Sequence, residues 1–233
     1  MLNSIWYLVE VMKTAERILL TALELFNEHG ENGVTSVDIA MELDISPGNL
    51  YYHYKGKEVI IDALVALHKK QMMSVLSRDV VNALSAEDVF YYLYILVEKL
   101  HLFRFLYRSQ ADLLEKYPGV EHPLRQLVNT LDAQLRNVLD KLIDDQSLSA
   151  SQSEKSLLAE TVTLILTQTC QADQIQRHQD AESMHYHALS LIMVILLPRL
   201  TLAEPEIAAI QNAIDSHTMA NLSSSVSGYL EAR

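Results

Sequence analysis

An all-α protein is predicted from three features of the sequence. Hydrophobic residues make up 49% of the 233 residues, whereas glycine and proline, which interrupt helices, occur only six and five times. No stretch of residues 80–233 alternates apolar and polar side chains with the period of two that a half-buried strand requires. Near the N-terminus, two short segments each carry a helix start signal. The sequence therefore predicts a small helical N-terminal domain followed by a larger helical domain.

The first predicted helix covers residues 13–28. Its apolar side chains recur at helical spacing, which places them on one face, and Gly30 closes the helix. We expect this face to pack across the next two helices and to complete a three-helix domain. The apolar residues are Ile18, Ala22, Leu25 and Phe26.

The segment at residues 35–54 has the pattern of two short helices joined by a tight turn. Thr35 and Asp38 form a capping-box pattern, so a helix should begin directly after Thr35. Ser46 followed by Pro47 combines an N-cap residue with proline at the first helical position, so a second helix should begin there. This arrangement is typical of a helix-turn-helix, and an ordinary helical hairpin is the alternative.

The second of these helices exposes an unusual face. Leu50 and Tyr54 should point inward, while Gly48, Asn49 and Tyr52 point the opposite way. Glycine allows close approach of a partner, and amide and hydroxyl groups can meet base edges and phosphates. This face therefore suits the major groove of double-stranded DNA.

Other polar groups near this helix could hold the DNA backbone. Lysines can neutralise phosphates, and hydroxyl and imidazole groups can hydrogen-bond to them. We assign base reading to Gly48, Asn49 and Tyr52. The predicted phosphate contacts are Thr35, Ser46, Tyr51, His53, Lys55 and Lys57, and Ser36 and Pro47 complete the predicted DNA-binding set.

This stretch resembles the DNA-binding domain of the TetR family of transcriptional regulators over residues 12–72. The family pattern runs Thr, three residues, Ile-Ala, a turn, Ser-x-Gly, Tyr-x-His-aromatic and Lys-x-Lys-Glu. Two positions depart from it, because Asp44 replaces the usual turn glycine and Leu43 a common small residue. The matching residues are Thr35, Ile39, Ala40, Ile45, Ser46, Gly48, Tyr51, His53, Tyr54, Lys55, Lys57 and Glu58, with Ala22, Leu25, Phe26 and Gly30 upstream.

Residues 73–220 form the second predicted domain. A helix at residues 57–77 should lead into it without a flexible linker. Apolar periodicity, and a capping box at Ser85 and Asp88, predict further helices. These are at residues 86–108, 111–116, 123–145, 154–178, 181–200 and 205–217, before a loose Ser-rich end.

The helices at residues 154–178 and 181–200 are strongly apolar. The resemblance implies that they pair with the same helices of a second subunit in a four-helix interface, which would cover an otherwise exposed patch. A homodimer implies a palindromic operator with half-sites roughly 34–36 Å apart.

An effector pocket is expected along the aromatic stretch from Phe90 to Tyr107. Apolar walls with a few polar groups are typical of small-ligand sites, and two arginines at i, i+4 could clamp an anion. A polar run at residues 167–171, inside an apolar helix, could also line a pocket or the dimer interface. The alternative is that these aromatics belong to the core and the arginines to surface ion pairs. The predicted ligand-binding residues are Tyr91, Tyr94, Phe103, Arg104, Tyr107, Arg108, Gln168 and Cys170.

Several classes of function lack support in the sequence. The single cysteine, Cys170, excludes an internal disulfide framework and fits a reducing cytoplasm. No metal-ligand spacing, phosphate loop or nucleophile motif is present, so we expect no metal, no cofactor and no enzyme activity. No apolar run is long enough to span a membrane. Residues 1–11 lack the features of a signal peptide, and we expect translation to start at Met12.

The net charge of −12 argues against indiscriminate nucleic-acid binding. Residues 12–72 contain six Lys/Arg and nine Asp/Glu, so specific binding requires the charges to be segregated on the surface. We therefore expect modest affinity for DNA, a weak dependence on salt and little non-specific binding.

The leading hypothesis is a dimeric transcriptional regulator, a repressor that an unknown small-molecule effector releases from DNA. In it, a three-helix DNA-binding domain (residues 12–72) precedes a helical ligand-binding and dimerisation domain (residues 73–220). The alternative is a constitutive DNA-binding protein of the same fold, regulated by a protein partner. A helical enzyme with an incidental hairpin is the third hypothesis.

Overall fold

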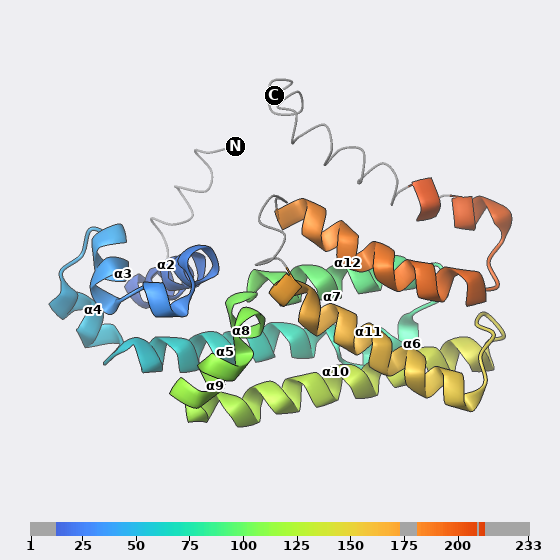
Figure 1. Ribbon diagram of the computed structural model, residues 1–233, viewed down its shortest axis with the longest axis horizontal. Coiled ribbons are helices and arrows are strands. Elements are labelled where there is room, and N and C mark those ends of the chain that lie inside the picture. The colour runs from blue at the N-terminus through green and yellow to red at the C-terminus, as the bar shows by residue number, and fades with distance from the viewer. Residues whose placement is uncertain (1–12, 173–180, 209, 213–233) are drawn as a thin grey trace, which may run out of the picture. The chain divides into compact units, whose positions relative to one another are not determined.

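Helices make up most of the part of the chain that the computed structural model describes, which is residues 13–172, 181–208 and 210–212 (Figure 1). No strand occurs in these ranges, although an isolated antiparallel bridge joins Leu148 to Leu200. The predicted all-α class is confirmed. The expected start at Met12, the predicted helix ends at residues 178 and 217, and the Ser-rich end lie outside the described residues.

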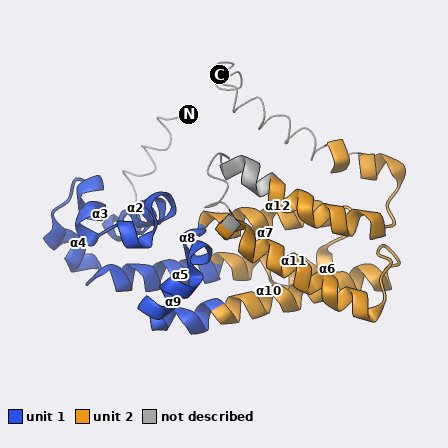
Figure 2. Cartoon of the chain, in the orientation of Figure 1, with its two compact units in different colours: residues 1–70, 103–124 blue, residues 71–102, 125–233 orange. Residues whose placement is uncertain are grey.

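The chain divides into two compact units (Figure 2). The first unit holds residues 1–70 and 103–124, and the second holds residues 71–102 and 125–233. Two helices, α5 (Lys57–Val75) and α10 (Pro118–Asp144), begin in the first unit and end in the second. These units reflect packing, and a functional division between residues 72 and 73 remains a prediction.

The first unit contains the three helices expected at the N-terminus. Helix α2 packs across α3 and α4, as its apolar face predicts. Ile18, Ala22 and Phe26 of α2 are fully buried, as are Ile39 of α3 and Leu50 of α4. The helical segments of this unit are α2 (Thr14–His29), η1 (Glu31–Gly33), α3 (Ser36–Glu42), α4 (Pro47–His53), α8 (Phe105–Arg108) and α9 (Gln110–Lys116), with the first parts of α5 and α10.

In the second unit, α12 lies along α7 and α11, and α11 also contacts α7 (Figure 1). Leu93 and Leu96 of α7, Leu166 of α11 and Ile192 of α12 are buried in its core. No helix in the described ranges is both long and apolar enough to cross a membrane. The segments are α6 (Arg78–Ala83), α7 (Val89–Leu102), α11 (Gln152–Ala172), α12 (Ala181–Leu196) and η2 (Leu197–Arg199), with the later parts of α5 and α10.

The prediction of one aromatic helix over residues 86–108 was wrong, because the chain breaks between α7 and α8. The cause is a contact distant in sequence. The backbone N–H of Phe105 donates to the side-chain oxygen of Asn27 at 3.1 Å instead of continuing the helical ladder, and Phe103 is fully buried against the ring of His68. Only one half of the predicted capping box at Ser85 is seen, because the carboxylate of Asp88 accepts the N–H of Ser85 while the N–H of Asp88 donates to the backbone carbonyl of Ser85. A turn follows, and α7 begins only at Val89.

The start of α10 was also predicted too late. Pro118, and not Pro123, occupies the first helical position, where the missing N–H of proline leaves no intrahelical bond unmade. Pro123 lies inside the helix one turn further on. The helix tolerates it near its N-terminus, where little of the hydrogen-bond ladder precedes it.

Candidate functional site

The turn between α3 and α4 has the geometry of a helix-ending Schellman motif. The N–H of Ile45 donates to the carbonyl of Ala40 at 3.0 Å, and that of Asp44 to the carbonyl of Met41 at 3.1 Å. Asp44 takes the left-handed conformation, with φ of 53°. Aspartate tolerates this region better than most non-glycine residues, so it can fill the position where the resembled family has glycine.

Helix α4 is fixed at its start and on its inner side. The hydroxyl of Ser46 accepts the N–H of Asn49 at 3.1 Å, and Pro47 opens the helix as predicted. Leu50 is buried beneath it. The hydroxyl of Tyr54 donates to the carbonyl of Ala15 at 3.3 Å, which ties the end of α4 to α2. Tyr54 thus serves packing, as expected from its position on the inner face.

The outer face of α4 is open to solvent. Tyr51 and Tyr52 are 59% and 81% exposed, and Gly48 and Asn49 are exposed beside them. A side-chain carbon at Gly48 would meet only the Ser46 hydroxyl, at an ordinary 3.9 Å. Packing within the protein therefore gives no reason for a glycine at position 48. A reason outside the chain, such as the close approach of a partner, fits this geometry.

Lys57 occupies a different place from the one that its predicted role requires. Its ammonium lies 2.7 Å from the carboxylate of Glu31 and donates to the backbone carbonyls of Glu31 and Val34, both at 2.9 Å. Since an ammonium has three N–H groups, all of them are used inside the protein. This geometry takes Lys57 out of the predicted phosphate contacts, whereas Lys55 is exposed.

The Thr35 hydroxyl is also used within the chain. It donates to the carboxylate of Asp38 at 2.7 Å and accepts the backbone N–H of Asp38 at 3.2 Å. The backbone N–H of Thr35 donates to the same carboxylate at 2.7 Å, which confirms the capping box. The hydrogen bonds from the hydroxyl and the N–H of Thr35 hold the pKa of Asp38 below its usual value. A hydroxyl that donates to Asp38 has no hydrogen left for a phosphate, so Thr35 is a poor phosphate contact. Ser36 and His53 are half-buried, whereas Ser46 and Pro47 are exposed.

The predicted ligand-binding residues are divided between the two units. Tyr91 is exposed, Tyr94 half-buried, Gln168 exposed and Cys170 buried, all in the second unit. Phe103, Arg104, Tyr107 and Arg108 lie in the first unit, where Phe103 and Tyr107 are core residues and Arg108 donates to the carbonyl of Asn27.

Two of these aromatic residues surround a buried histidine. The Tyr107 hydroxyl and Nε2 of His68 are 2.7 Å apart, and the His68 ring lies 4.5 Å from that of Phe103. Burial lowers the pKa of His68 to about 3. His68 is therefore neutral near pH 7, and this cluster is part of the packing of the first unit.

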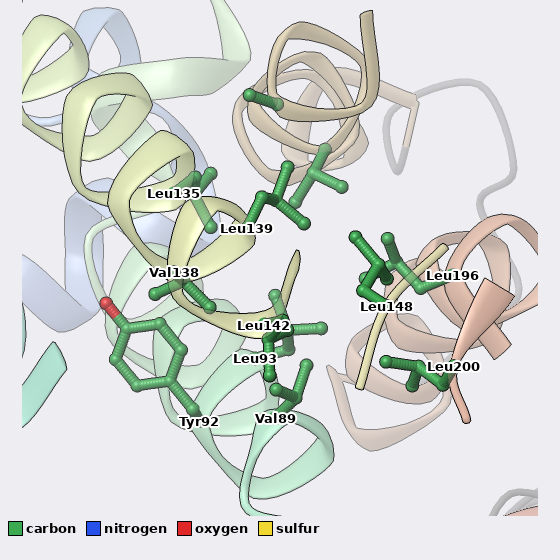
Figure 3. Close-up of a pocket in the computed structure, with 12 residues that line it drawn as sticks. Val89, Tyr92, Leu93, Leu135, Val138, Leu139, Leu142, Leu148, Leu196 and Leu200 are labelled. Carbon is green, nitrogen blue, oxygen red and sulfur yellow. The ribbon is translucent and has the colours of Figure 1, made fainter. Parts of the chain in front are cut away.

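A small cavity of about 20 Å³ lies in the second unit (Figure 3). Its walls are aliphatic apart from Tyr92, whose hydroxyl points to the side away from Leu148, Leu196 and Leu200 (Figure 3). The sequence analysis missed the cavity, because its residues come from four helices and two loops and share no pattern. The lining residues are Val89, Tyr92, Leu93, Leu135, Val138, Leu139, Leu142, Leu148, Ala159, Val162, Leu196 and Leu200.

The described residues contain no candidate metal-binding site. Within residues 13–172, 181–208 and 210–212, no group of three or more His, Cys, Asp or Glu residues is arranged to hold an ion.

Family models match most of the chain. The model described as "Bacterial regulatory proteins, tetR family" matches residues 18–64, which include α3 and α4. The model described as "Bacterial transcriptional repressor" matches residues 67–206.

Known regulators are similar over a part of the chain. The HTH-type transcriptional regulator UidR of Escherichia coli K12 is 34% identical over 65 residues, which cover 28% of this chain and 33% of UidR. The class D tetracycline repressor protein of Escherichia coli is 43% identical over 49 residues, which cover 21% of this chain and 22% of that protein. The chain thus matches about a third or less of the length of these relatives.

A solved structure is similar over nearly the whole chain. A TetR-family transcriptional regulator from Marinobacter aquaeolei VT8 superposes with a TM-score of 0.74 at 26% identity, covering 88% of this chain and 99% of that one. A TetR regulator from Legionella pneumophila, at 18% identity and a TM-score of 0.61, shares the fold.

Proposed function

Since the chain belongs to the TetR family of DNA-binding transcriptional regulators, we propose that it acts in the cytoplasm as a homodimeric repressor that a small molecule releases from a palindromic operator. The outer face of α4 carries this proposal. Its glycine is not required by internal packing, and an amide and two phenols stand exposed beside it. In a helix-turn-helix, the N-terminal residues of the second helix contact base edges in the major groove.

The contacts proposed for DNA follow from this placement. Gly48, Asn49 and Tyr52 read bases, while Ser46, Tyr51 and Lys55 hold phosphates. Ser46 keeps its hydroxyl hydrogen for a phosphate, because its oxygen serves as the acceptor for the N–H of Asn49. Ser36, Pro47 and His53 remain proposed neighbours of the backbone.

The proposed dimer would form through α11 and α12. Leu157 and Leu164 stand one above the other on α11, 63% and 53% exposed, and Leu191 and Val194 of α12 are 41% and 74% exposed. Exposure of such large apolar side chains to water is unfavourable, and their burial against a second copy of the chain would stabilise a dimer. Twofold symmetry then presents two α4 helices to two half-sites roughly 34–36 Å apart.

The proposed effector would enter the second unit at the cavity between α7, α10, α11 and α12. The lining has no charged side chain, so a charged molecule would lose its hydration without compensation. A neutral, apolar molecule fits these walls. At about 20 Å³ the cavity has room for one water molecule at most. An effector would therefore have to move the surrounding leucines, and such a movement is what a switch needs.

The same small volume favours a second candidate function, a constitutive DNA-binding protein that is regulated by a protein partner. Thermal-shift screening with neutral hydrophobic compounds distinguishes the two. A compound that raises the melting temperature and weakens operator binding supports the effector. A screen without such a compound favours the partner.

The proposed function is tested by selecting duplexes from a random pool with the purified full-length chain. We expect enrichment of a palindromic sequence that binds two chains per duplex. A pool that shows no enrichment even in dilute salt would contradict the proposal.

A further inference from the structure

Three segments of the first unit meet at one carboxylate. Glu31, in the short turn η1 after α2, has a side chain that is only 6% exposed. Its Oε1 lies 2.7 Å from the ammonium of Lys57 and 2.9 Å from that of Lys116, and it accepts a hydrogen bond from the Tyr117 hydroxyl. Lys57 opens α5, while Lys116 and Tyr117 lie where α9 ends and α10 begins.

The Lys57 ammonium also holds both ends of the helix-turn-helix. It donates to the carbonyl of Val34, the residue directly before the Thr35 cap of α3. Lys57 itself follows α4 by only a few residues. The start of α3 and the chain leaving α4 are therefore held by the same cation, and Glu31 fixes that cation in turn.

The carboxylate is charged at neutral pH. Burial alone would raise the pKa of Glu31, but the hydrogen bonds from Lys57, Tyr117 and Lys116 outweigh burial and hold the pKa below its usual value. A buried carboxylate with several donors on one oxygen depends on all of them, because removal of one leaves charge uncompensated. Lys57, Lys116 and Tyr117 are thus linked through one shared oxygen atom.

We propose that Glu31 is a positioning residue, which couples the α9–α10 junction to the helix-turn-helix through Lys57 and so sets the affinity for the operator. The inference rests on the proposed function. Helix α10 runs from this junction into the second unit, where Leu135, Val138, Leu139 and Leu142 line the cavity. A shift of the first turn of α10 would be passed through Glu31 and Lys57 to α4, and no residue that contacts DNA would change.

The test uses the full-length chain and the duplex that it selects most strongly from a random pool. The variants are Glu31→Gln, Lys116→Met and their combination. Glu28→Gln, on an exposed carboxylate of α2 three residues earlier, is the matched control. The dissociation constant is measured over a salt series well below each variant's melting temperature.

We expect Glu31→Gln to weaken duplex binding about tenfold, within the usual range of coupling between sites. Its salt dependence should equal that of the wild type, since no phosphate contact is lost. Lys116→Met should also weaken duplex binding, and the double variant should bind no more weakly than Glu31→Gln. Lys116→Arg, which keeps the positive charge, should bind the duplex as the wild type does. Glu28→Gln should bind as the wild type does.

Two outcomes distinguish the inference from the function on which it rests. If the wild type selects no duplex, the proposed function fails. If the wild type binds while Glu31→Gln and Lys116→Met, folded but less stable, bind equally well, then Glu31 only supports the fold and the inference is overturned. Should Glu31→Gln not fold, Lys116→Met decides alone, because that side chain is 45% exposed and its loss should be tolerated.

Discussion

The ammonium nitrogen of Lys57 lies 2.7 Å from Oε1 of Glu31, so this lysine is turned into the protein. Lys55, two residues earlier, is exposed. Two lysines that look equivalent in the sequence thus have different surroundings, and their effects on DNA binding should differ in kind.

The salt dependence of duplex binding separates the two lysines. Each lost phosphate contact reduces the slope of log K against log salt by about 0.9 on duplex DNA. We expect Lys55→Ala to reduce the slope by about that amount. Lys57→Met should leave the slope unchanged even where it weakens binding, because its ammonium is held by Glu31 and Val34. Equal reductions in the two variants, measured by fluorescence anisotropy, would show that Lys57 does reach a phosphate.

His68 should make the protein less stable in mild acid. Its ordinary pKa of 6.5 falls to about 3 in the folded protein because it is buried. The unfolded chain therefore takes up a proton first as the pH falls. The contribution of His68 to stability is fully present above about pH 6.5. As the pH falls below this value, the free energy of unfolding declines by about 1.4 kcal/mol per pH unit until the pKa of the folded state is approached.

Substitution of His68 identifies its share of this effect. The free energy of unfolding of His68→Gln, compared with that of the wild type by urea unfolding between about pH 5 and 7, should depend on pH less steeply by about 1.4 kcal/mol per pH unit. Glu31 does not interfere in this window, because a lowered carboxyl pKa affects stability only below its ordinary value of 4.5. Identical pH slopes in the two proteins would mean that His68 titrates normally in the folded state.

Tyr92 buries a hydroxyl for which no hydrogen-bond partner is found in the described part of the chain. Burial raises its pKa to about 12, so the phenol is neutral. An unsatisfied buried polar group costs about 1–3 kcal/mol. Tyr92→Phe should therefore leave the free energy of unfolding unchanged or raise it, as measured by urea denaturation. A loss of more than about 1 kcal/mol would reveal a hydrogen bond at this hydroxyl.

The exposed leucines of α11 test the proposed dimer. Leu157→Glu with Leu164→Glu places charges where a second copy would pack, and we expect a monomer by light scattering. Ile95→Glu, on the exposed side of α7, is the matched control and should leave the mass of the particle unchanged. If the double variant remains a dimer, the interface does not include this face of α11.

Much of the fold could be predicted because short sequence patterns determine where these helices begin and which side chains they bury. The capping box at Thr35 and the Ser46-Pro47 start both form as expected, and apolar spacing places Leu50 in the core. The break between α7 and α8 could not be predicted, since it depends on Asn27, 78 residues away from Phe105. No local pattern contains such a contact.

The site residues show the same limit. Exposure of Gly48 and Tyr52 follows from helical geometry once α4 is placed. The orientation of Lys57 depends on acceptors 23 and 26 residues earlier in the chain. The cavity is assembled from residues as far apart as Val89 and Leu200, none of which differs from an ordinary core residue by type.

Gly48→Ala gives the most direct test that the outer face of α4 reads DNA. A methyl group at position 48 has room within the protein, and alanine favours a helix over glycine by up to about 1 kcal/mol, so stability should be kept or increased. Gly33→Ala, at another glycine with space around it, is the control.

We predict that Gly48→Ala melts no lower than the wild type and yet binds the selected duplex at least about tenfold more weakly, the effect of losing about 1.4 kcal/mol of contact. Gly33→Ala should bind as the wild type does. If Gly48→Ala binds the duplex with unchanged affinity, the face led by Gly48 does not enter the groove, and the central claim is contradicted.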